Sequence, residues 1–276
     1  MNTKHIVGKL ITVVALLSVV GTGATALYRL DARPRTDDAF LLADIADIAP
    51  DVSGKIIDLK VRNNQAVHAG DVLFVIDPEP YKYKVDSLKA QLDLATKTLA
   101  RQDALLEKGH TSQASDDQAK STLDNLRANT AIAERDLRMT TVVAPFDGRI
   151  AGLNIAVGEY ATAGKSLFTM IATSRWFAVG NFRETEIARM KPGTPATVFV
   201  MAQPDRPLVG HVESIGWGVL PDDASVVNGL PRVPRALNWV RLAQRFPVRV
   251  LLDNPPDDLM RLGASAVVVV RHDDAR

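Results

Sequence analysis

The sequence contains no cysteine, which excludes disulfide bonds and thiolate-bound metal sites. It also excludes lipid attachment to an N-terminal cysteine. The five histidines show no metal-ligand spacing and the six methionines do not cluster, so we expect no metal site. With a formal net charge of +1, the composition favours neither nucleic acid nor an acidic partner.

Catalytic motifs are also lacking. The sequence contains no nucleophile with a matching general base and no glycine-rich phosphate loop. Two pairs of neighbouring carboxylates, Asp222-Asp223 and Asp273-Asp274, fall in an expected loop and in the C-terminal tail, where such pairs are usually solvated. We therefore expect no enzyme activity, no catalytic residues and no cofactor.

A long uncharged segment near the N-terminus is the first positive signal. Residues 10–28 carry no charge over 19 positions, and a membrane span needs about 20 apolar residues. Lys4 and Lys9 precede this segment, which predicts residues 1–9 in the cytoplasm and a transmembrane anchor after them. The alternative is a signal peptide cleaved near residues 24–26. Both alternatives export the rest of the chain, and a bacterial periplasm is the natural destination.

Residues 54–76 and 148–170 repeat one pattern at an offset of 94 positions. The identical pairs are Gly54/Gly148, Ile56/Ile150, Leu59/Leu153, Ala69/Ala163, Gly70/Gly164, Leu73/Leu167 and Phe74/Phe168. The repeated glycines suit a positive φ angle or a close backbone approach. A repeat of this length cannot bury its apolar face alone, so we expect the two copies to pack as one domain. Its shared core should contain Ile56, Leu59, Leu73, Ile150, Leu153 and Leu167.

A helical segment, residues 79–141, separates the two halves, which we place at residues 51–78 and 142–172. Apolar residues recur at alternating intervals of four and three over residues 80–108, and a similar seam follows over residues 114–139. This spacing is typical of coiled coils, and the short turn between the segments predicts an antiparallel hairpin. With a rise of about 1.5 Å per residue, the arm is about 43 Å long. The alternative is that both helices pack on a globular core.

The remaining segments flank this hairpin domain. Short strand-like runs with one helix predict a small β-barrel over residues 173–252. Residues 29–50 read as a linker followed by a membrane-proximal strand. Residues 253–276 read as a C-terminal membrane-proximal strand with a tail.

These segments together resemble a known family. The two half-motifs resemble the halves of a biotinyl/lipoyl carrier domain. The helical insertion resembles that of periplasmic adaptors, or membrane fusion proteins of the HlyD type, from tripartite efflux pumps. The resemblance rests on the runs TDDAF, APDVSGKI, GDVLFVIDP, APFDGRI, VGEYATAGKSLF and NFRETEI. Two later runs, NWVRLAQRFPVRV and GASAVVVV, resemble the multidrug and aromatic-acid exporter subgroup. The hairpin is shorter than in many members.

The resemblance implies a mixed α/β fold that is mainly β. An N-terminal transmembrane helix is followed by a split biotinyl/lipoyl-like domain, which an antiparallel coiled-coil α-hairpin interrupts, and then by a small β-barrel. The implied function is that of an adaptor linking an inner-membrane transporter to a TolC-type outer-membrane channel for export of drugs or aromatic acids. The implied protein crosses the bacterial inner membrane once, lies mostly in the periplasm, forms a homo-oligomer and binds no nucleic acid.

Arg101, Leu105 and Ser112 follow the spacing R-x3-L-x6-S near the expected hairpin tip. Adaptors of the family use such a motif to dock on an outer-membrane channel, so the resemblance implies that role here. Independently, Leu105 lies off the heptad seam beside Leu106, and Arg101 precedes it by one turn on the same face. The alternative is a solvated arginine, a flanking leucine and a serine that caps the second helix.

Two other functions remain open. An adaptor for protein secretion by an ATP-driven exporter would share this fold, although that class usually has a longer hairpin. A carrier protein would hold biotin or lipoate on a lysine at the tight turn between the two halves. In this sequence residues 79–140 replace that turn, so the carrier function is a remote alternative.

Overall fold

The computed structural model describes residues 34–188, 190–219 and 243–271, together with residues 18, 21, 22, 226, 227, 230 and 231. Apart from three positions, the expected anchor lies outside the described residues, as does the end of the expected C-terminal tail. Within the described part, no helix combines the length and the apolar composition that crossing a membrane requires. The chain forms two compact units, Asp44–Ser174 and a second made of Met1–Ala43 with Arg175–Arg276.

The unit Asp44–Ser174 contains both halves of the repeat. Its strands are β2 (Gly54–Leu59), β3 (Ala66–Val67), β4 (Val72–Ile76), β5 (Thr141–Val143), β6 (Gly148–Ala151), β7 (Tyr160–Ala161) and the beginning of β8 (Phe168–Arg183). Strand β2 pairs antiparallel with β7, and β6 pairs in the same way with β3. Gly54 lies opposite Ala161 and Gly148 lies opposite Val67, which is the same pairing shifted by the repeat offset. The two halves therefore exchange strands and form one quasi-symmetric domain.

The second pair of glycines in the repeat, Gly70 and Gly164, occupies equivalent turns. Gly70 has φ 89° and Gly164 has φ 75°, a region that other residues adopt at a steric cost. The Gly70 N–H donates to the carbonyl of Ala144 at 2.8 Å, and the Gly164 N–H donates to the carbonyl of Pro50 at 2.9 Å. Because Pro50 and Ala144 are also related by the repeat offset, each turn is tied to the other half of the domain.

The first glycines of the repeat are needed for close approach rather than for an unusual φ. A Cβ atom on Gly54 would lie 2.6 Å from a methyl carbon of Ile76, and one on Gly148 would lie 2.6 Å from the carbonyl oxygen of Ile171. Neither position therefore has room for a side chain in this packing.

The core of this unit draws on both halves, but unequally. Ile56, Leu73 and Ile150 are fully buried in one apolar cluster. Leu59, Leu153 and Leu167 pack against that cluster and are only partly buried. Leu59 is the last residue of β2, Leu153 follows the end of β6 by two positions, and Leu167 directly precedes β8. The two halves thus share one core, and three of its six expected members lie at the edge of that core.

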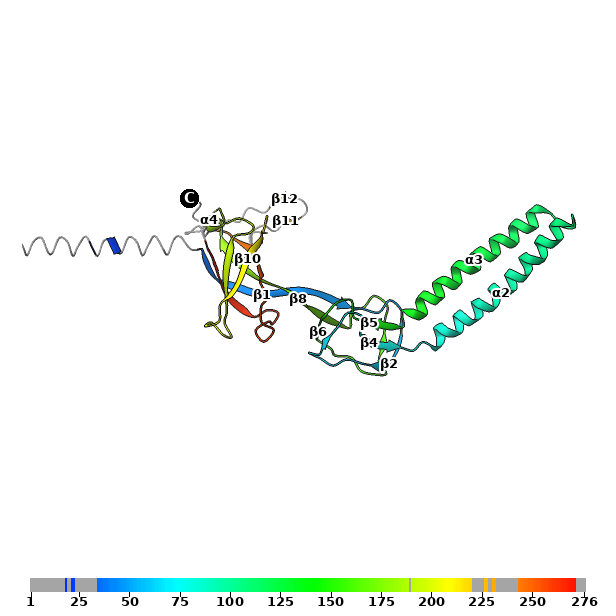
Figure 1. Cartoon of the computed structure of the whole chain (residues 1–276), viewed down its shortest axis with the longest axis horizontal. Coiled ribbons are helices and arrows are strands. Elements are labelled where there is room, and N and C mark those ends of the chain that lie inside the picture. The colour runs from blue at the N-terminus through cyan, green and yellow to red at the C-terminus, as the bar shows by residue number, and fades with distance from the viewer. Residues whose placement is uncertain are drawn as a thin grey trace, which may run out of the picture. The chain divides into compact units, whose positions relative to one another are not determined.

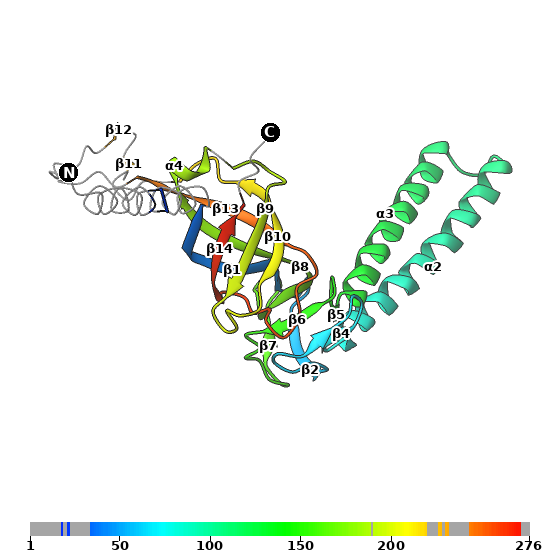
Figure 2. The same ribbon diagram turned by 60° about the vertical axis from the view of Figure 1, so that its left-hand side comes forward.

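The helices α2 (Glu79–Glu107) and α3 (Gln113–Arg138) lie between β4 and β5 in sequence. Figures 1 and 2 show them side by side as a hairpin. Few of their side chains are buried: Val85 and Ala95 on α2, and Asp116, Leu123, Thr130 and Ala133 on α3. The two expected helices are present within one residue of their expected bounds, whereas the coiled-coil supercoil stays a prediction.

The second unit is a β-barrel (Figure 2). Its six strands follow the order β1 (Arg35–Ile48), β14 (Ser265–Val270), β9 (Pro195–Val200), β10 (Leu208–Ile215), β13 (Arg245–Leu252) and β8, and β1 pairs with β8 to close it. Alternate residues point inward, so Val198, Val250 and Val268 are fully buried. The short helix α4 (Glu184–Ile187) follows β8. A separate ribbon is formed by β11 (Val226–Val227) and β12 (Leu230–Pro231).

The structure places two strands in the barrel that the sequence analysis assigned to other segments of the chain. Strand β14 falls in the segment expected to be membrane-proximal, and β1 falls in the segment expected to be a linker with a strand. In the structure β14 is hydrogen-bonded between β1 and β9. Without both strands the sheet would expose unpaired edges, so closure of the barrel explains their position.

Candidate functional site

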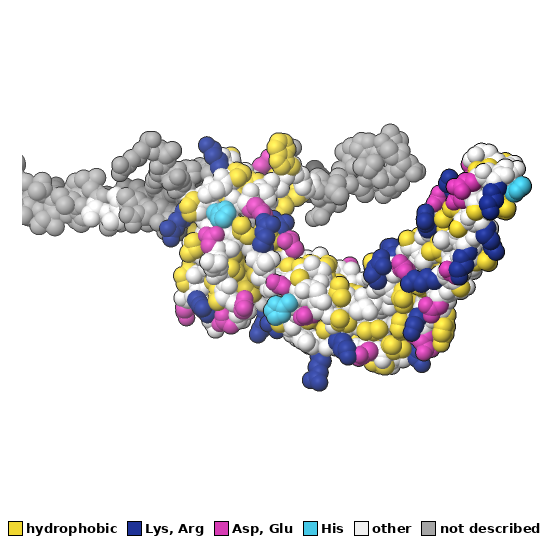
Figure 3. Space-filling model, turned by 45° about the vertical axis from the view of Figure 1, so that its right-hand side comes forward, with side chains coloured by type: hydrophobic (Ala, Val, Ile, Leu, Met, Phe, Trp, Pro, Cys, Tyr) yellow, Lys and Arg dark blue, Asp and Glu magenta, His cyan; other side chains and the backbone are white. Residues whose placement is uncertain are grey.

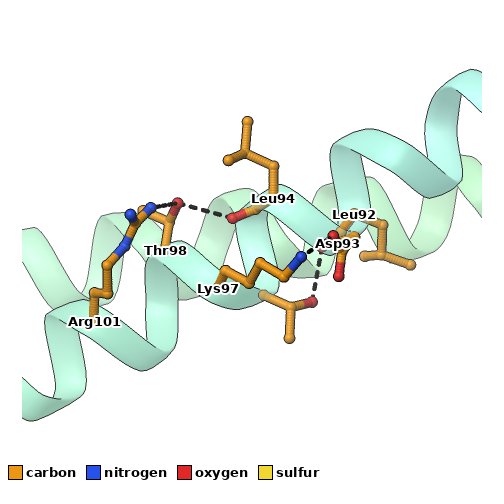
Figure 4. A network of polar contacts seen from close by, with 7 residues as sticks. Leu92, Asp93, Leu94, Lys97, Thr98 and Arg101 are labelled. Atoms are coloured by element: carbon orange, nitrogen blue, oxygen red, sulfur yellow. Dashed lines mark hydrogen bonds and ion pairs between the residues drawn. The ribbon is translucent and has the colours of Figure 1, made fainter.

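The tip of the hairpin presents two of the three expected docking residues on one face of α2. Arg101 and Leu105 are separated by one helical turn, and the Leu105 side chain is 41% exposed. An Arg101 guanidinium N–H donates to Thr98 Oγ1 at 3.1 Å, and the Thr98 hydroxyl donates to the carbonyl of Leu94 at 2.8 Å (Figure 4). Leu94, Thr98 and Arg101 therefore lie along the same side of the helix.

Ser112 occupies a different position from the other two docking residues. It is the N-cap of α3, with an extended backbone, and its Oγ accepts a hydrogen bond from the N–H of Ser115 at 3.3 Å. This bond satisfies one of the N–H groups that the first helical turn leaves free. Ser112 thus has a structural role at the turn, and it remains exposed.

The turn between the helices is tied back to α2. Gly109 ends the helix with φ 70°, and its N–H donates to the carbonyl of Leu106 at 2.9 Å. The Thr111 hydroxyl donates to Gln102 Oε1 at 3.1 Å, which joins the turn to the last turns of the helix. These contacts fix where the tip residues are presented.

Charged side chains link the two helices on another face of the hairpin. Lys89 on α2 and Glu134 on α3 form an ion pair of 2.8 Å. Their hydrogen bond raises the pKa of Lys89 and lowers the pKa of Glu134. Figure 3 shows side chains of both charge signs gathered along the hairpin. Exposed pairs of this kind contribute little stability, so the pair chiefly keeps the face polar.

Closer to the tip, two carboxyl groups meet across the helices. Asp116 on α3 is only 2% exposed, and its Oδ2 lies 3.6 Å from the ammonium of Lys120. Its Oδ1 is buried without a hydrogen-bond partner in the described part of the chain. A hydrogen bond with Asp116 raises the pKa of Asp103 on α2, with burial as the second cause. Sequence reasoning missed this pair, although Asp116 lies three residues before Ala119 on the heptad seam.

The position at which a carrier protein would hold its cofactor is occupied by the hairpin. Strand β4 ends at Ile76 and α2 begins at Glu79, while α3 ends at Arg138 and β5 begins at Thr141. The tight turn that would present a lysine between the two halves is therefore replaced. Among the described residues, no group of three or more His, Cys, Asp or Glu side chains is placed to hold a metal ion.

Comparisons with known proteins agree with this architecture. Residues 44–173 match the family model described as the RND MFP barrel-sandwich hybrid domain. Residues 175–271 match the model described as the AAEA-like beta-barrel domain. The first range corresponds to the unit Asp44–Ser174, and the second lies within the part of the barrel unit that follows it in sequence.

Relatives of known name cover nearly the whole chain. The multidrug resistance protein MdtN of Shigella flexneri is 38% identical over 94% of this chain and 94% of its own. A MacA-MexA chimeric protein carrying the Pseudomonas aeruginosa MexA α-hairpin domain shares the fold, with a TM-score of 0.69 at 18% identity over 87% of this chain and 80% of that one. The membrane fusion protein Spr0693 of Streptococcus pneumoniae R6 gives a TM-score of 0.65 at 15% identity over 87% and 99%.

The split β domain, the helical insertion and the barrel are the architecture that these comparisons associate with membrane fusion proteins. The chain belongs to the membrane fusion protein family of periplasmic adaptors.

Proposed function

We propose that this chain is the adaptor subunit of a tripartite efflux pump, which links an inner-membrane transporter to a TolC-type outer-membrane channel. Drugs or aromatic acids are the exported class. The membership of the family and the similarity to a multidrug resistance protein support this function. The adaptor's role is architectural, and the transporter supplies the work of export.

Different segments of the chain carry out different parts of this role. Residues 10–28 anchor the protein in the inner membrane by a single pass, and the anchor and barrel hold the transporter. The hairpin reaches toward the channel, and the 29 residues of α2 give it a length of about 43 Å. Several copies side by side form a sealed conduit, so the protein acts as a homo-oligomer.

One observation carries the channel contact: an apolar side chain is left exposed at the tip with an arginine one turn away. Leu105 is 41% exposed and lies off the heptad seam, so we expect it to contribute little to the hairpin's own packing. Fully burying a leucine in a partner groove is worth about 1.5–3 kcal/mol. Arg101 adds a charge-assisted hydrogen bond to a channel carbonyl or carboxylate, a stronger bond than a neutral one.

An adaptor for ATP-driven protein secretion is the second candidate, because that class shares the fold. The short hairpin, with 26 residues in α3, favours the efflux pump. The carrier function has less support, because the lysine-bearing turn is replaced by the hairpin.

Purification with native partners tests this function. The full-length tagged protein is chemically cross-linked in its own membranes, isolated, and its partners are identified by mass spectrometry. The proposal predicts one inner-membrane drug transporter and one outer-membrane channel. Recovery of an ATP-driven protein exporter supports the second candidate. A biotinyl or lipoyl adduct on the intact chain supports the carrier. Recovery of neither a transporter nor a channel contradicts the proposal.

A further inference from the structure

Strand β14 of the barrel is apolar on both of its faces. Val268 points inward and is fully buried, whereas its neighbours Val267 and Val269 point outward and are only partly buried. The strand lies between β1 and β9 (Figure 2). On β9, Phe199 pairs with Val267 and is also partly buried. Because the solvated face of an antiparallel sheet is normally polar, we expect this outer wall to contact an apolar partner.

The outer wall is hollowed into a groove with a volume of about 1260 Å³. Six of its eleven lining side chains are apolar, namely Phe199, Met201, Pro204, Pro207, Val267 and Val269. The other five are Arg35, Asp37, Thr197, Ser265 and Arg271. Apolar walls with a few polar groups are typical of sites for small molecules, whose volumes run from about 300 to 1,000 Å³. This groove exceeds that range, so it has room for an elongated molecule.

The positive charges of the groove lie at one end, where β1 begins and β14 stops. Arg35 pairs with Val269, and Arg271 lies two positions beyond Val269. Diagonal neighbours of this kind are about 7–8 Å apart. Both arginines are exposed, and neither forms an ion pair within the part of the chain that the structure describes. With Asp37 as the acidic member of the lining, this end carries two positive charges and one negative charge, which favours an anion.

The apolar part of the groove is long enough for a hydrocarbon chain. From Arg271 to Ser265 the wall extends over six residues, or about 20 Å at about 3.3 Å per residue. At the far end, Met201 is tied to Ser265 by a backbone hydrogen bond of 3.0 Å, and its side chain is 60% exposed. The acyl chains of one leaflet cover half of a hydrocarbon core of about 30 Å, which is about 15 Å. A chain of that length fits along the wall with its head group at the arginines.

We propose that this groove binds a long-chain carboxylate. The carboxylate lies between Arg35 and Arg271, whose guanidinium groups can donate paired hydrogen bonds to it. The hydrocarbon chain lies along Val269, Val267 and Phe199. This site is separate from the channel contact of the proposed function, because the barrel and not the hairpin provides it.

Other occupants fit the groove less well. A compact aromatic acid would cover only part of the wall of about 20 Å and would leave the rest of its apolar surface in water. A cationic amphiphile would place its charge beside Arg35 and Arg271 with Asp37 as its only partner in the lining. A protein partner would have to fill a hollow rather than cover a flat face, and its presence is one outcome of the test below.

Photolabelling in a defined bilayer tests the proposed ligand. The full-length protein is reconstituted into phosphatidylcholine vesicles without transporter or channel. Palmitate with a diazirine at the end of its chain is added and illuminated, and the labelled peptides are identified by mass spectrometry. We expect label within residues 199–207, which hold four of the apolar lining residues. Unlabelled palmitate in excess should reduce the label at least about tenfold, whereas hexadecyltrimethylammonium or benzoate should leave it within about twofold.

Each alternative gives a different result. Label found only outside the outer wall overturns the proposal. Equal competition by hexadecyltrimethylammonium overturns the anionic end of the site, and equal competition by benzoate overturns the chain. If phosphatidylglycerol in the vesicles abolishes the label, the occupant is a membrane phospholipid and the carboxylate proposal fails. Because no transporter or channel is present, these outcomes leave the proposed function untouched.

A matched pair of double variants tests the charged end. Arg35→Gln with Arg271→Gln removes the two arginines of the groove. Arg245→Gln with Arg261→Gln removes two exposed arginines of the same unit that do not line it. We expect the first variant to raise the half-saturating concentration of the photoreactive palmitate at least about tenfold (about 1.4 kcal/mol), and the second to change it within about twofold (about 0.4 kcal/mol). Circular dichroism should give the same melting temperature for both. Equal labelling of the two variants contradicts the proposal.

A cross-linking arm in native membranes checks for a protein on the same wall. A photoreactive residue replaces Val267 in the groove or Val209, which is 63% exposed on the next strand and does not line it. We expect no protein adduct at position 267 above the level at position 209. Capture of a transporter or of a second copy of this chain above that level makes the wall a protein contact and overturns the proposal.

Discussion

Phe74 and Phe168 occupy equivalent positions in the two halves of the repeat, and their rings meet edge to face. The ring centroids are 6.1 Å apart and the ring planes are inclined by 71°. Both side chains are buried in the cluster that joins the halves. Edge-to-face pairs add about 0.5–1.5 kcal/mol beyond the area they bury. The pair therefore couples two segments that are 94 positions apart in sequence.

The first prediction concerns this pair. Phe74→Ala and Phe168→Ala should each lower the free energy of unfolding by about 3–5 kcal/mol, because each leaves a cavity in the shared core. In a double-mutant cycle the two losses should couple by about 0.5–1.5 kcal/mol. Ile57→Ala, at an exposed position of β2, should change stability by about 0.5 kcal/mol or less. If denaturant unfolding shows that the two losses add strictly, the two rings are not energetically coupled.

The second prediction uses an asymmetry of the repeat. Leu73 is fully buried, whereas its counterpart Leu167 is only partly buried just before β8. Leu73→Ala should therefore cost about 2–5 kcal/mol, and Leu167→Ala should cost less than half of its partner's loss. Thermal and denaturant unfolding of the two variants check this order. Equal losses would show that both positions belong to the tightly packed core.

The third prediction separates two roles of Ser112. Ser112→Ala removes the cap of α3 and should lower hairpin stability by about 0.5–2 kcal/mol. Ser112→Asp keeps a capping oxygen and should retain the stability, while its carboxylate cannot donate the hydroxyl hydrogen to a channel group. We therefore expect Ser112→Asp to fold normally and to export poorly. Export at the unmodified level would leave Ser112 with the capping role alone.

The fourth prediction is a pH dependence at the tip. The hydrogen bond with Asp116 raises the pKa of Asp103 above its unfolded value, so folding favours the protonated form. The stability from this pair is fully present below the ordinary aspartate pKa of about 3.9, and it is lost as the pH rises through the raised pKa. Lys120 opposes this shift, and Glu107 adds slightly to it.

Asp103→Asn tests that dependence, because an amide donates to Asp116 at every pH. The variant should be more stable than the unmodified hairpin at neutral pH, and the difference should shrink as the pH falls. The Lys89–Glu134 pair has the opposite pH dependence, since its lowered carboxyl pKa makes its contribution disappear in acid. It is unchanged in the variant and cancels in the comparison. If the difference in stability between the variant and the unmodified protein stays constant with pH, the raised pKa of Asp103 is contradicted.

The sequence predicts local features better than long-range pairing. The repeat offset, the positive φ of Gly70 and Gly164 and the two helices follow from local spacing and turn chemistry. The barrel positions of β1 and β14 do not, because their pairing joins strands more than two hundred residues apart. Asp116 shows a similar limit: its seam position is visible in the sequence, but its contact with Asp103 depends on how the two helices align.

The docking role of the three tip residues was also inferred from local sequence spacing, and it stays a prediction. The spacing of Arg101, Leu105 and Ser112 and the off-seam position of Leu105 are sequence features. The structure adds the exposure of Leu105. It also shows a pocket between α2 and α3, which depends on the antiparallel alignment of Leu94 and Thr98 with Thr122 and which no local pattern specifies.

Export through the hairpin tip tests the central claim most directly. Arg101→Asp and Leu105→Asp are compared with Leu123→Asp, which places a charge at a buried seam position. Drug export, cross-linking to the outer-membrane channel and a circular-dichroism melt are measured for each. The account predicts that both tip variants fold and reach the membrane normally but lose channel cross-linking and export, while Leu123→Asp unfolds the hairpin. Normal export by folded Leu105→Asp, with channel cross-linking unchanged, would contradict the account.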